Sequence, residues 1–271
     1  MAGGRLTVVG TGFLVAGQAT PEASACMRAA DRLLFLVAEP ATRRWLQSEF
    51  PRAQSMADSF WEGRPRLDAY EEVVGRILAP LREGLDVCAA FYGHPGVFVH
   101  SSHEAVRRAR AEGFDAEMLP GVSAEDCLFA DLGVDPALRG LQSFEASSFL
   151  LRRRKVDASA ALVLWQIGAL GVTTYSTQTL WNRDGLDLLV EALLEVYPAE
   201  HEVVVYEATL LPVCEPLIQR VPVARIAETK VSTYSTLYVP PARQAPLDEA
   251  MLARLGLAAA PATTAAGEAK R

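Results

Sequence analysis

The chain has 271 residues, half of them hydrophobic, a length sufficient for one large domain or two of ordinary size. Its formal net charge of -7 argues against nucleic acid as the main partner. No stretch approaches the roughly 20 apolar residues that span a bilayer, and the N-terminus lacks a signal-peptide pattern, so we expect no membrane association.

Short apolar runs alternate with helical patterns along the first half, which predicts an α/β architecture. Strands are expected at residues 5–9, 32–37, 86–92 and 117–119. Thr20 followed by Pro21 is typical of a helix N-terminus, with a capping hydroxyl and a proline at the first helical position. A helical period over residues 67–82 predicts a longer helix, which Pro80 should kink or shorten. Ser102 is expected to cap a further helix.

The second half repeats this alternation with different lengths. We expect strands at residues 161–167, 202–208 and 232–239, and a helix over 186–196. After Pro241 the composition shifts to alanine, threonine and glycine, which predicts at most one short helix within 247–257 and then a disordered tail. The predicted organisation is therefore two α/β subdomains, residues 1–120 and 121–241, followed by a flexible tail, 242–271.

The four cysteines are scattered: Cys26, Cys88, Cys127 and Cys214. They form no C-x-x-C pair and have no histidine nearby at metal-ligand spacing, so no metal site is expected. Buried, reduced thiols in a cytoplasmic protein are the simplest account. The basic run at residues 152–155 is expected to be a solvated loop.

Three strand ends carry loops in which a ligand can bind, at residues 10–12, 92–96 and 120–123. The first lacks the third glycine of a dinucleotide fingerprint, because position 15 is Val15, and no Walker lysine follows. The serine hydrolase motif G-x-S-x-G is also absent, since Ser123 lies in "PGVSA". The residues by themselves thus leave an α/β enzyme of unknown class.

Three segments together carry a specific resemblance: "VVGTG", "FYGHPGVFV" and "MLPGVSAEDCLFADLGVDP". The chain resembles the tetrapyrrole methylase superfamily of S-adenosyl-L-methionine-dependent methyltransferases from Gly4 to Pro241. Within it, the chain is most similar to borosin-type enzymes, which methylate backbone amides of ribosomally synthesised peptides. At the position where corrin-modifying relatives have a sequence similar to "GDP", this chain has Gly93-His94-Pro95.

The resemblance implies two α/β domains with S-adenosyl-L-methionine in the cleft between them. Position by position, it implies that the cofactor contacts Tyr92, His94, Val97, Phe98, Ser123, Ala124, Gln166, Ala208, Ser235 and Thr236. Val97 and Phe98 can equally well be explained by core packing, and core packing and cofactor contact are compatible roles. His94 is read as a turn residue at the position where relatives have an acid.

Methylation of a backbone amide requires particular side chains, because resonance with the carbonyl makes the nitrogen a poor nucleophile. A base must face the N–H, and a cation or donor must face the oxygen. The resemblance assigns these roles to Arg66, which would stabilise charge on oxygen, and to Tyr70 as base or polariser, with Tyr92 as a further catalytic phenol. Arg66 and Tyr70 share a face if their helix begins at or before Arg66.

One position departs from the family pattern. Phe60 stands where the resemblance implies a tyrosine, so a phenol is missing from the substrate-binding site, and Ala57 replaces another. Either Tyr70 and Tyr92 suffice, or the enzyme is slow, or the chain is a peptide-binding relative without turnover. A precorrin-type C-methyltransferase is the other alternative, and its cleft would need several cations.

The resemblance also implies a peptide partner and a homodimer. Fused borosin enzymes carry their substrate after a helical clasp, whereas residues 242–271 are rich in alanine and lack a run of Val, Ile and Leu. We therefore expect a stand-alone, split enzyme that acts in trans on a separate precursor peptide, with which the dimer forms a heterotetramer if both chains bind one.

Overall fold

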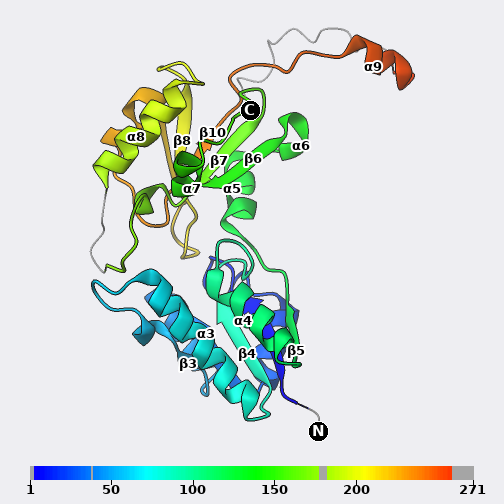
Figure 1. The fold of residues 1–271 in the computed structure, drawn as a ribbon, viewed down its shortest axis with the longest axis vertical. Coiled ribbons are helices and arrows are strands. Elements are labelled where there is room, and N and C mark those ends of the chain that lie inside the picture. The colour runs from blue at the N-terminus through cyan, green and yellow to red at the C-terminus, as the bar shows by residue number, and fades with distance from the viewer. Residues whose placement is uncertain (1–2, 38, 177–181, 258–271) are drawn as a thin grey trace.

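The computed structural model describes residues 3–37, 39–176 and 182–257 (Figure 1). It contains two five-stranded sheets flanked by helices, one in each half of the chain. Figure 1 shows the two halves one above the other, with the C-terminal segment projecting away from both. The α/β architecture predicted from the alternating pattern is confirmed. The subdomain boundary at residue 120 falls between two elements and stays a prediction.

The first sheet is parallel throughout and has the order β3-β2-β4-β1-β5. Its strands are β1 (Arg5–Gly10), β2 (Arg32–Leu36), β3 (Gln54–Ser55), β4 (Val87–Phe91) and β5 (Asp115–Met118). Its helices are α1 (Pro21–Ala29), α2 (Pro40–Glu49), η1 (Ala57–Ser59), α3 (Arg66–Arg82) and α4 (His100–Ala111). Helices α3 and α4 cover one face and α1 and α2 the other, so the central strands are apolar on both sides.

The second sheet is mixed and has the order β6-β7-β10-β8-β9, with only β6 and β7 parallel. Its strands are β6 (Leu141–Glu145), β7 (Ala161–Trp165), β8 (Glu202–Glu207), β9 (Leu217–Pro222) and β10 (Thr236–Val239). Its helices are α5 (Ala124–Leu132), α6 (Pro136–Arg139), α7 (Ala146–Leu151), η2 (Ile167–Ala169), α8 (Arg183–Leu194) and η3 (Val223–Glu228). One face packs on α7, α8 and η3, and the other on α5.

The helix α9 (Glu249–Arg254) is the short C-terminal helix expected from the sequence. It packs against neither sheet in Figure 1. The tail predicted beyond residue 257 lies outside the described residues. Among those described, no helix has both the length and the apolar content required to cross a bilayer.

Helix α3 begins at Arg66, so the condition for Arg66 and Tyr70 to share a face is met. The helix runs to Arg82, the end that the periodicity predicts, and contains Pro80 in its last turn, so the shortening expected at the proline does not occur. At the other helix, the prediction for Ser102 was wrong. Helix α4 begins at His100, and the Ser102 hydroxyl donates to the carbonyl oxygens of Val99 (2.8 Å) and Pro95. A serine in a first turn bonds to preceding carbonyls as readily as it caps.

Two expected strands are shorter than predicted. β7 ends at Trp165 because Gln166 adopts a φ of +60°, which is incompatible with an extended strand. β10 starts at Thr236 rather than 232, because residues 232–235 form a turn. In that turn the Ser232 N–H donates to the Ser235 hydroxyl at 2.8 Å.

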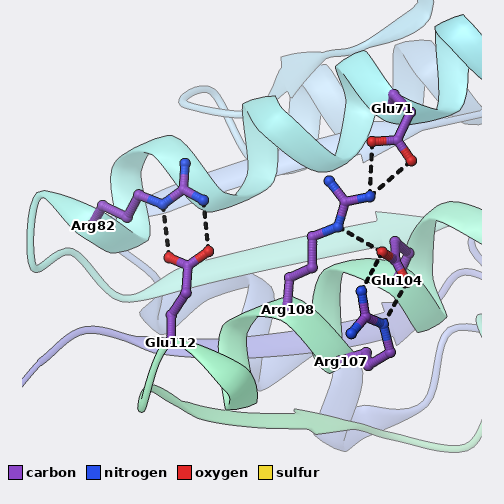
Figure 2. Close-up of polar contacts among 6 residues, drawn as sticks. All are labelled: Glu71, Arg82, Glu104, Arg107, Arg108 and Glu112. Carbon is purple, nitrogen blue, oxygen red and sulfur yellow. Dashed lines mark hydrogen bonds and ion pairs between the residues drawn. The ribbon is translucent and has the colours of Figure 1, made fainter.

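Charged side chains link α3 to α4 across the outer face of the first sheet (Figure 2). Arg82 forms a two-point pair with Glu112, at 2.7 and 2.6 Å. Arg108 bridges Glu71 at 2.8 Å and Glu104 at 2.6 Å, and Arg107 also pairs with Glu104. These hydrogen bonds hold the pKa of Glu104 down at about 2. The network fixes the helix that carries Arg66 against its neighbour.

Candidate functional site

A pocket lies between the two halves, lined by residues from both of them. It is formed where β1, β4 and β7 end, by the start of α5, and by the 232–235 turn. Its lining residues are Phe13, Tyr92, Gly93, His94, Val97, Phe98, Val99, Ser123, Ala124, Trp165, Gln166, Thr233, Tyr234 and Thr236. We call this the cleft pocket. Its place at the ends of parallel strands agrees with the general rule for ligand sites in α/β folds.

Eight of the ten cofactor positions expected from the resemblance line the cleft pocket: Tyr92, His94, Val97, Phe98, Ser123, Ala124, Gln166 and Thr236. Ala208 and Ser235 are not among the lining residues. Ser235 lies fully buried in the turn before β10, and its hydroxyl donates to the carboxylate of Glu207 at the end of β8. Ala208 packs against the apolar cluster beneath α5. The contact of any of these residues with a cofactor stays a prediction.

The sequence reasoning missed three aromatic residues of the pocket. Phe13 comes from the loop after β1, Trp165 from the end of β7 and Tyr234 from the turn before β10. Phe13 packs edge-on against Tyr92, with ring centroids 6.0 Å apart, and Tyr234 does the same at 6.3 Å. The end of a predicted strand was a usable signal for Trp165, since it had already indicated Gln166. Nothing local marks Phe13 or Tyr234.

The loops after β1 and β4 approach each other closely beside the pocket, and only glycine permits this approach. Gly12 and Gly93 form an isolated antiparallel bridge, with the Gly93 N–H donating to the Gly12 carbonyl at 2.9 Å. Gly93 has a φ of +68°, and a Cβ there would lie 2.8 Å from the Phe13 ring. A Cβ on Gly10 would lie 2.3 Å from the Gly93 carbonyl oxygen. The loops after β1 and β4 therefore form one close-packed cradle.

His94 acts as a turn residue, as predicted from its place in the motif. Its Nδ1 accepts a hydrogen bond from the Gly96 N–H at 2.9 Å, so the neutral ring carries its proton on Nε2. Two residues beyond that turn, Phe98 holds a φ of +55°, which is uncommon for a bulky residue. Its ring lies 5.4 Å from that of Trp165. A strained residue of the first half thus packs directly against the second half, at the pocket wall.

The start of α5 faces the pocket through Ser123 and Ala124. The Ser123 hydroxyl accepts from the Asp126 N–H at 3.2 Å, and the Asp126 carboxylate accepts from the Ser123 N–H at 2.7 Å, a reciprocal capping box. The plain role of Ser123 is therefore to cap a helix. First-turn N–H groups lack carbonyl partners within the helix, so this end offers donors to polar atoms in the pocket.

A group of phenols and one guanidinium meets beside the pocket. Tyr92 keeps 39% of its surface open to the pocket, yet the protein around it desolvates the phenol and raises its pKa to about 12. Tyr234 and Tyr70 raise this pKa further, and Arg66 opposes them. At neutral pH Tyr92 is therefore a neutral hydrogen-bond donor. Arg66 and Tyr70 are not lining residues, but both lie close enough to act on Tyr92.

The residues around Arg66 come from both halves of the chain. The Arg66 N–H donates to the Thr173 carbonyl at 2.9 Å, and its Nε donates to the Thr174 carbonyl at 3.3 Å. Tyr70 packs between Phe60, at 6.0 Å, and His100, at 5.8 Å between ring centroids. The predicted catalytic residues Arg66, Tyr70 and Tyr92 and the predicted substrate contact Phe60 therefore lie in one neighbourhood.

The shape and chemistry of the cleft pocket fit a nucleoside cofactor. Aromatic and aliphatic walls from Phe98, Trp165 and Val97 suit a flat base, and Gln166 and Thr236 supply polar groups. Gly10 and Gly93 let the loops after β1 and β4 pack closely at this end of the sheet, because a Cβ on either would lie within 3 Å of other protein atoms. Within the described residues, no group of His, Cys, Asp or Glu is arranged to hold a metal ion.

Comparison with known proteins agrees with this arrangement. Residues 5–212 match the family described as tetrapyrrole (corrin/porphyrin) methylases. The uroporphyrin-III-C-methyltransferase of Thermus thermophilus has the same fold, with a TM-score of 0.63 over 89% of this chain and 93% of that one, at 20% identity.

Curated relatives are considerably more similar in sequence. A Gymnopus fusipes protein named methyltransferase/ribosomally synthesized cyclic peptide gymnopeptides precursor is 40% identical over 88% of this chain. The corresponding omphalotin A precursor of Omphalotus olearius is also 40% identical over 88%. This chain spans 57% and 58% of the length of these two relatives. The family match covers most of the chain, and the chain therefore belongs to the tetrapyrrole methylases, S-adenosyl-L-methionine-dependent methyltransferases.

Proposed function

We propose that this chain methylates backbone amide nitrogens of a peptide, with S-adenosyl-L-methionine as the methyl donor. The observation that carries the proposal is the convergence of Arg66, Tyr70 and Tyr92 beside the cleft pocket. The relatives support it, because they are named both as methyltransferases and as precursors of ribosomally synthesised peptides. When bound in the cleft pocket, the cofactor supplies an electrophilic methyl group.

Arg66 makes the target amide reactive by stabilising charge on its oxygen. An amide nitrogen becomes nucleophilic as it loses its proton and charge moves to the carbonyl oxygen. The guanidinium is always charged and carries several donors in one plane, which suits that oxygen. Its bond to the Thr174 carbonyl holds the guanidinium in a fixed orientation, so little reorganisation is needed during the reaction.

Tyr70 and Tyr92 have different tasks in this proposal. Tyr70, one helical turn from Arg66, either orients the amide N–H as a phenol or, as a phenolate, takes its proton while the bond from nitrogen to the methyl group forms. Tyr92 donates a hydrogen bond toward the pocket, because a phenol whose pKa is raised to about 12 stays protonated at neutral pH. Phe60 contributes an apolar wall beside Tyr70 rather than a hydroxyl.

We also propose that the substrate is a separate peptide, and that two copies of the chain pair in solution, binding one peptide each. The first part rests on composition, because residues 242–257 contain no run of Val, Ile and Leu. Sedimentation equilibrium with and without peptide distinguishes the dimer from the heterotetramer. A precorrin-type substrate is disfavoured, because none of the described residues that line the pocket is Lys or Arg.

The test is mass spectrometry after incubation with the cofactor and a short acetylated peptide of alternating valine, isoleucine and glycine. We expect methyl increments on the peptide, located by fragmentation on backbone nitrogens. The variant Arg66→Gln should lower kcat/KM by about 10²–10³, the typical cost of losing one oxyanion donor. The matched control is Arg28→Gln, which removes an exposed arginine paired with Glu49 on the far face. Increments on the chain itself would overturn the trans proposal, and an unmodified peptide would overturn amide methylation.

A further inference from the structure

A segment of the second half crosses to the start of α3 and pairs with it. The Tyr175 N–H donates to the Arg64 carbonyl at 2.7 Å, and the Gly63 N–H donates to the Tyr175 carbonyl at 2.9 Å. Pro65 and Thr174 form an antiparallel bridge beside these two bonds. The pairing joins residues more than a hundred positions apart, and hydrogen bonds on both sides of Tyr175 fix its backbone. We call residues 173–175 the crossing segment.

The Tyr175 side chain continues the row of rings beside Arg66. Its ring centroid lies 5.5 Å from that of Phe60, which in turn lies 6.0 Å from that of Tyr70. Tyr175 is also near enough to act on Tyr234, whose pKa is raised chiefly by burial and further by the Tyr175 phenol. Tyr234 lines the cleft pocket and packs against Tyr92. Tyr175 is therefore close both to the Arg66 neighbourhood and to a residue that lines the pocket.

Phe60 provides no hydroxyl at this place, whereas Tyr175, whose ring packs on that of Phe60, does. Phe60 can only offer an apolar surface to a peptide, whereas a phenol both donates and accepts hydrogen bonds. A peptide laid beside Arg66 exposes a carbonyl and an N–H at every residue, and these groups need partners once water is displaced.

We propose that Tyr175 is a substrate-binding residue, whose hydroxyl bonds the peptide backbone beside the target amide in place of the phenol missing at Phe60. The inference rests on the proposed peptide methylation. It assigns part of the substrate site to the second half of the chain, delivered by the crossing segment. Because the backbone pairing and the ring contact with Phe60 are independent of the hydroxyl, Tyr175→Phe removes the proposed contact alone.

The experiment compares Tyr175→Phe, the exchange variant Phe60→Tyr/Tyr175→Phe, and the control Tyr197→Phe. Tyr197 lies in the core of the second half, and its hydroxyl has no hydrogen-bond partner among the described residues. With the valine, isoleucine and glycine peptide as probe, Tyr175→Phe should raise KM for the peptide by up to about tenfold, the range for one neutral hydrogen bond. The Kd for S-adenosyl-L-methionine should stay within about twofold of that of the wild type, since the proposed contact is to the peptide alone.

The exchange variant provides a readout that a structural role would not move. It returns one hydroxyl to the row of rings, and KM for the peptide should return to within about threefold of the wild-type value. Equal KM values for Tyr175→Phe and Tyr197→Phe would overturn the inference, as would an exchange variant no better than Tyr175→Phe. If the variants gave either of these results but the wild-type chain methylated the peptide, the inference on Tyr175 would fail and the proposed function would remain intact. A wild-type chain without methyl transfer would instead remove the proposed function, and this inference with it.

Discussion

Replacing Gly93 by alanine should both destabilise the fold and weaken cofactor binding. The φ of +68° costs an alanine about 1–2 kcal/mol. The new Cβ would lie 2.8 and 3.2 Å from two atoms of the Phe13 ring, so that ring must turn away from its rotamer, at about 0.5–1.5 kcal/mol. The expected total is about 1.5–3.5 kcal/mol. Because Phe13 and Tyr92 line the cleft pocket edge to face, the movement should also reach the cofactor.

Gly113→Ala is the matched control for this substitution. Gly113 follows α4 with a φ of +89°, and a Cβ added there would meet no heavy atom of the described residues within 4 Å. It should therefore lose only the backbone part, about 1–2 kcal/mol. The stiffening of the unfolded chain by alanine is common to both variants and cancels in their difference.

Urea unfolding at constant pH measures the two stability changes, and calorimetry with S-adenosyl-L-methionine measures binding. Gly93→Ala should be less stable than Gly113→Ala by about 0.5–1.5 kcal/mol. In the double variant with Phe13→Ala that excess should disappear, as expected for two residues in contact. Equal losses in the two glycine variants, with cofactor affinity unchanged in both, would refute the reasoning.

Two further predictions concern pH. Hydrogen bonds from Arg107 and Arg108 lower the pKa of Glu104 from 4.5 to about 2, so this carboxylate stabilises the fold above pH 4.5 and its contribution is lost as pH falls toward 2. Acid unfolding followed by circular dichroism should be less steep in that window for Glu104→Gln, and identical curves would contradict the role given to the network in Figure 2. At alkaline pH, burial raises the pKa of Tyr92 from 10.0 to about 12. Between these two values the folded state keeps a proton that the unfolded state loses, so the free energy of unfolding should fall as the pH rises from 10 to about 12. Tyr92→Phe should lessen this fall and remove a late-titrating phenolate absorbance near pH 12; a phenol of Tyr92 that titrates near pH 10 would disprove the assigned environment.

Most strands with continuous apolar runs were predictable within one or two residues, β10 being an exception at its start, and strands with mixed patterns were missed. β1 and β8 are buried along nearly their whole length, so a short apolar run identified them. β6 and β9 are half exposed and were missed. Helix α2 was missed as well, although Glu39 before a proline caps it by accepting from the Thr42 N–H at 2.6 Å.

The residues of the candidate site likewise include some that were predictable from the sequence and some that were not. The residues in the loop after β4 and at the start of α5 were predictable, because their motifs are continuous in sequence and end up in one pocket. Tyr234 and Tyr175 were not, because each lies in an ordinary local sequence and reaches the site only through pairing of the two halves. Ser102 shows a related limit, since both of its hydrogen-bonding options agree with the same sequence.

The crossing segment also bears on how the chain is made. Arg66 is held by the Thr174 carbonyl, 108 residues later in the sequence. At ribosomal rates of about 5–20 residues per second, Arg66 leaves the peptidyl transfer centre roughly 5–20 s before its anchor does. The first sheet has all its strands by residue 118 and can form during that interval. Arg66, the arginine proposed to be catalytic, cannot be oriented by this contact until synthesis has passed Tyr175, so a nascent chain stalled before that point would carry a folded first half with an incomplete proposed site.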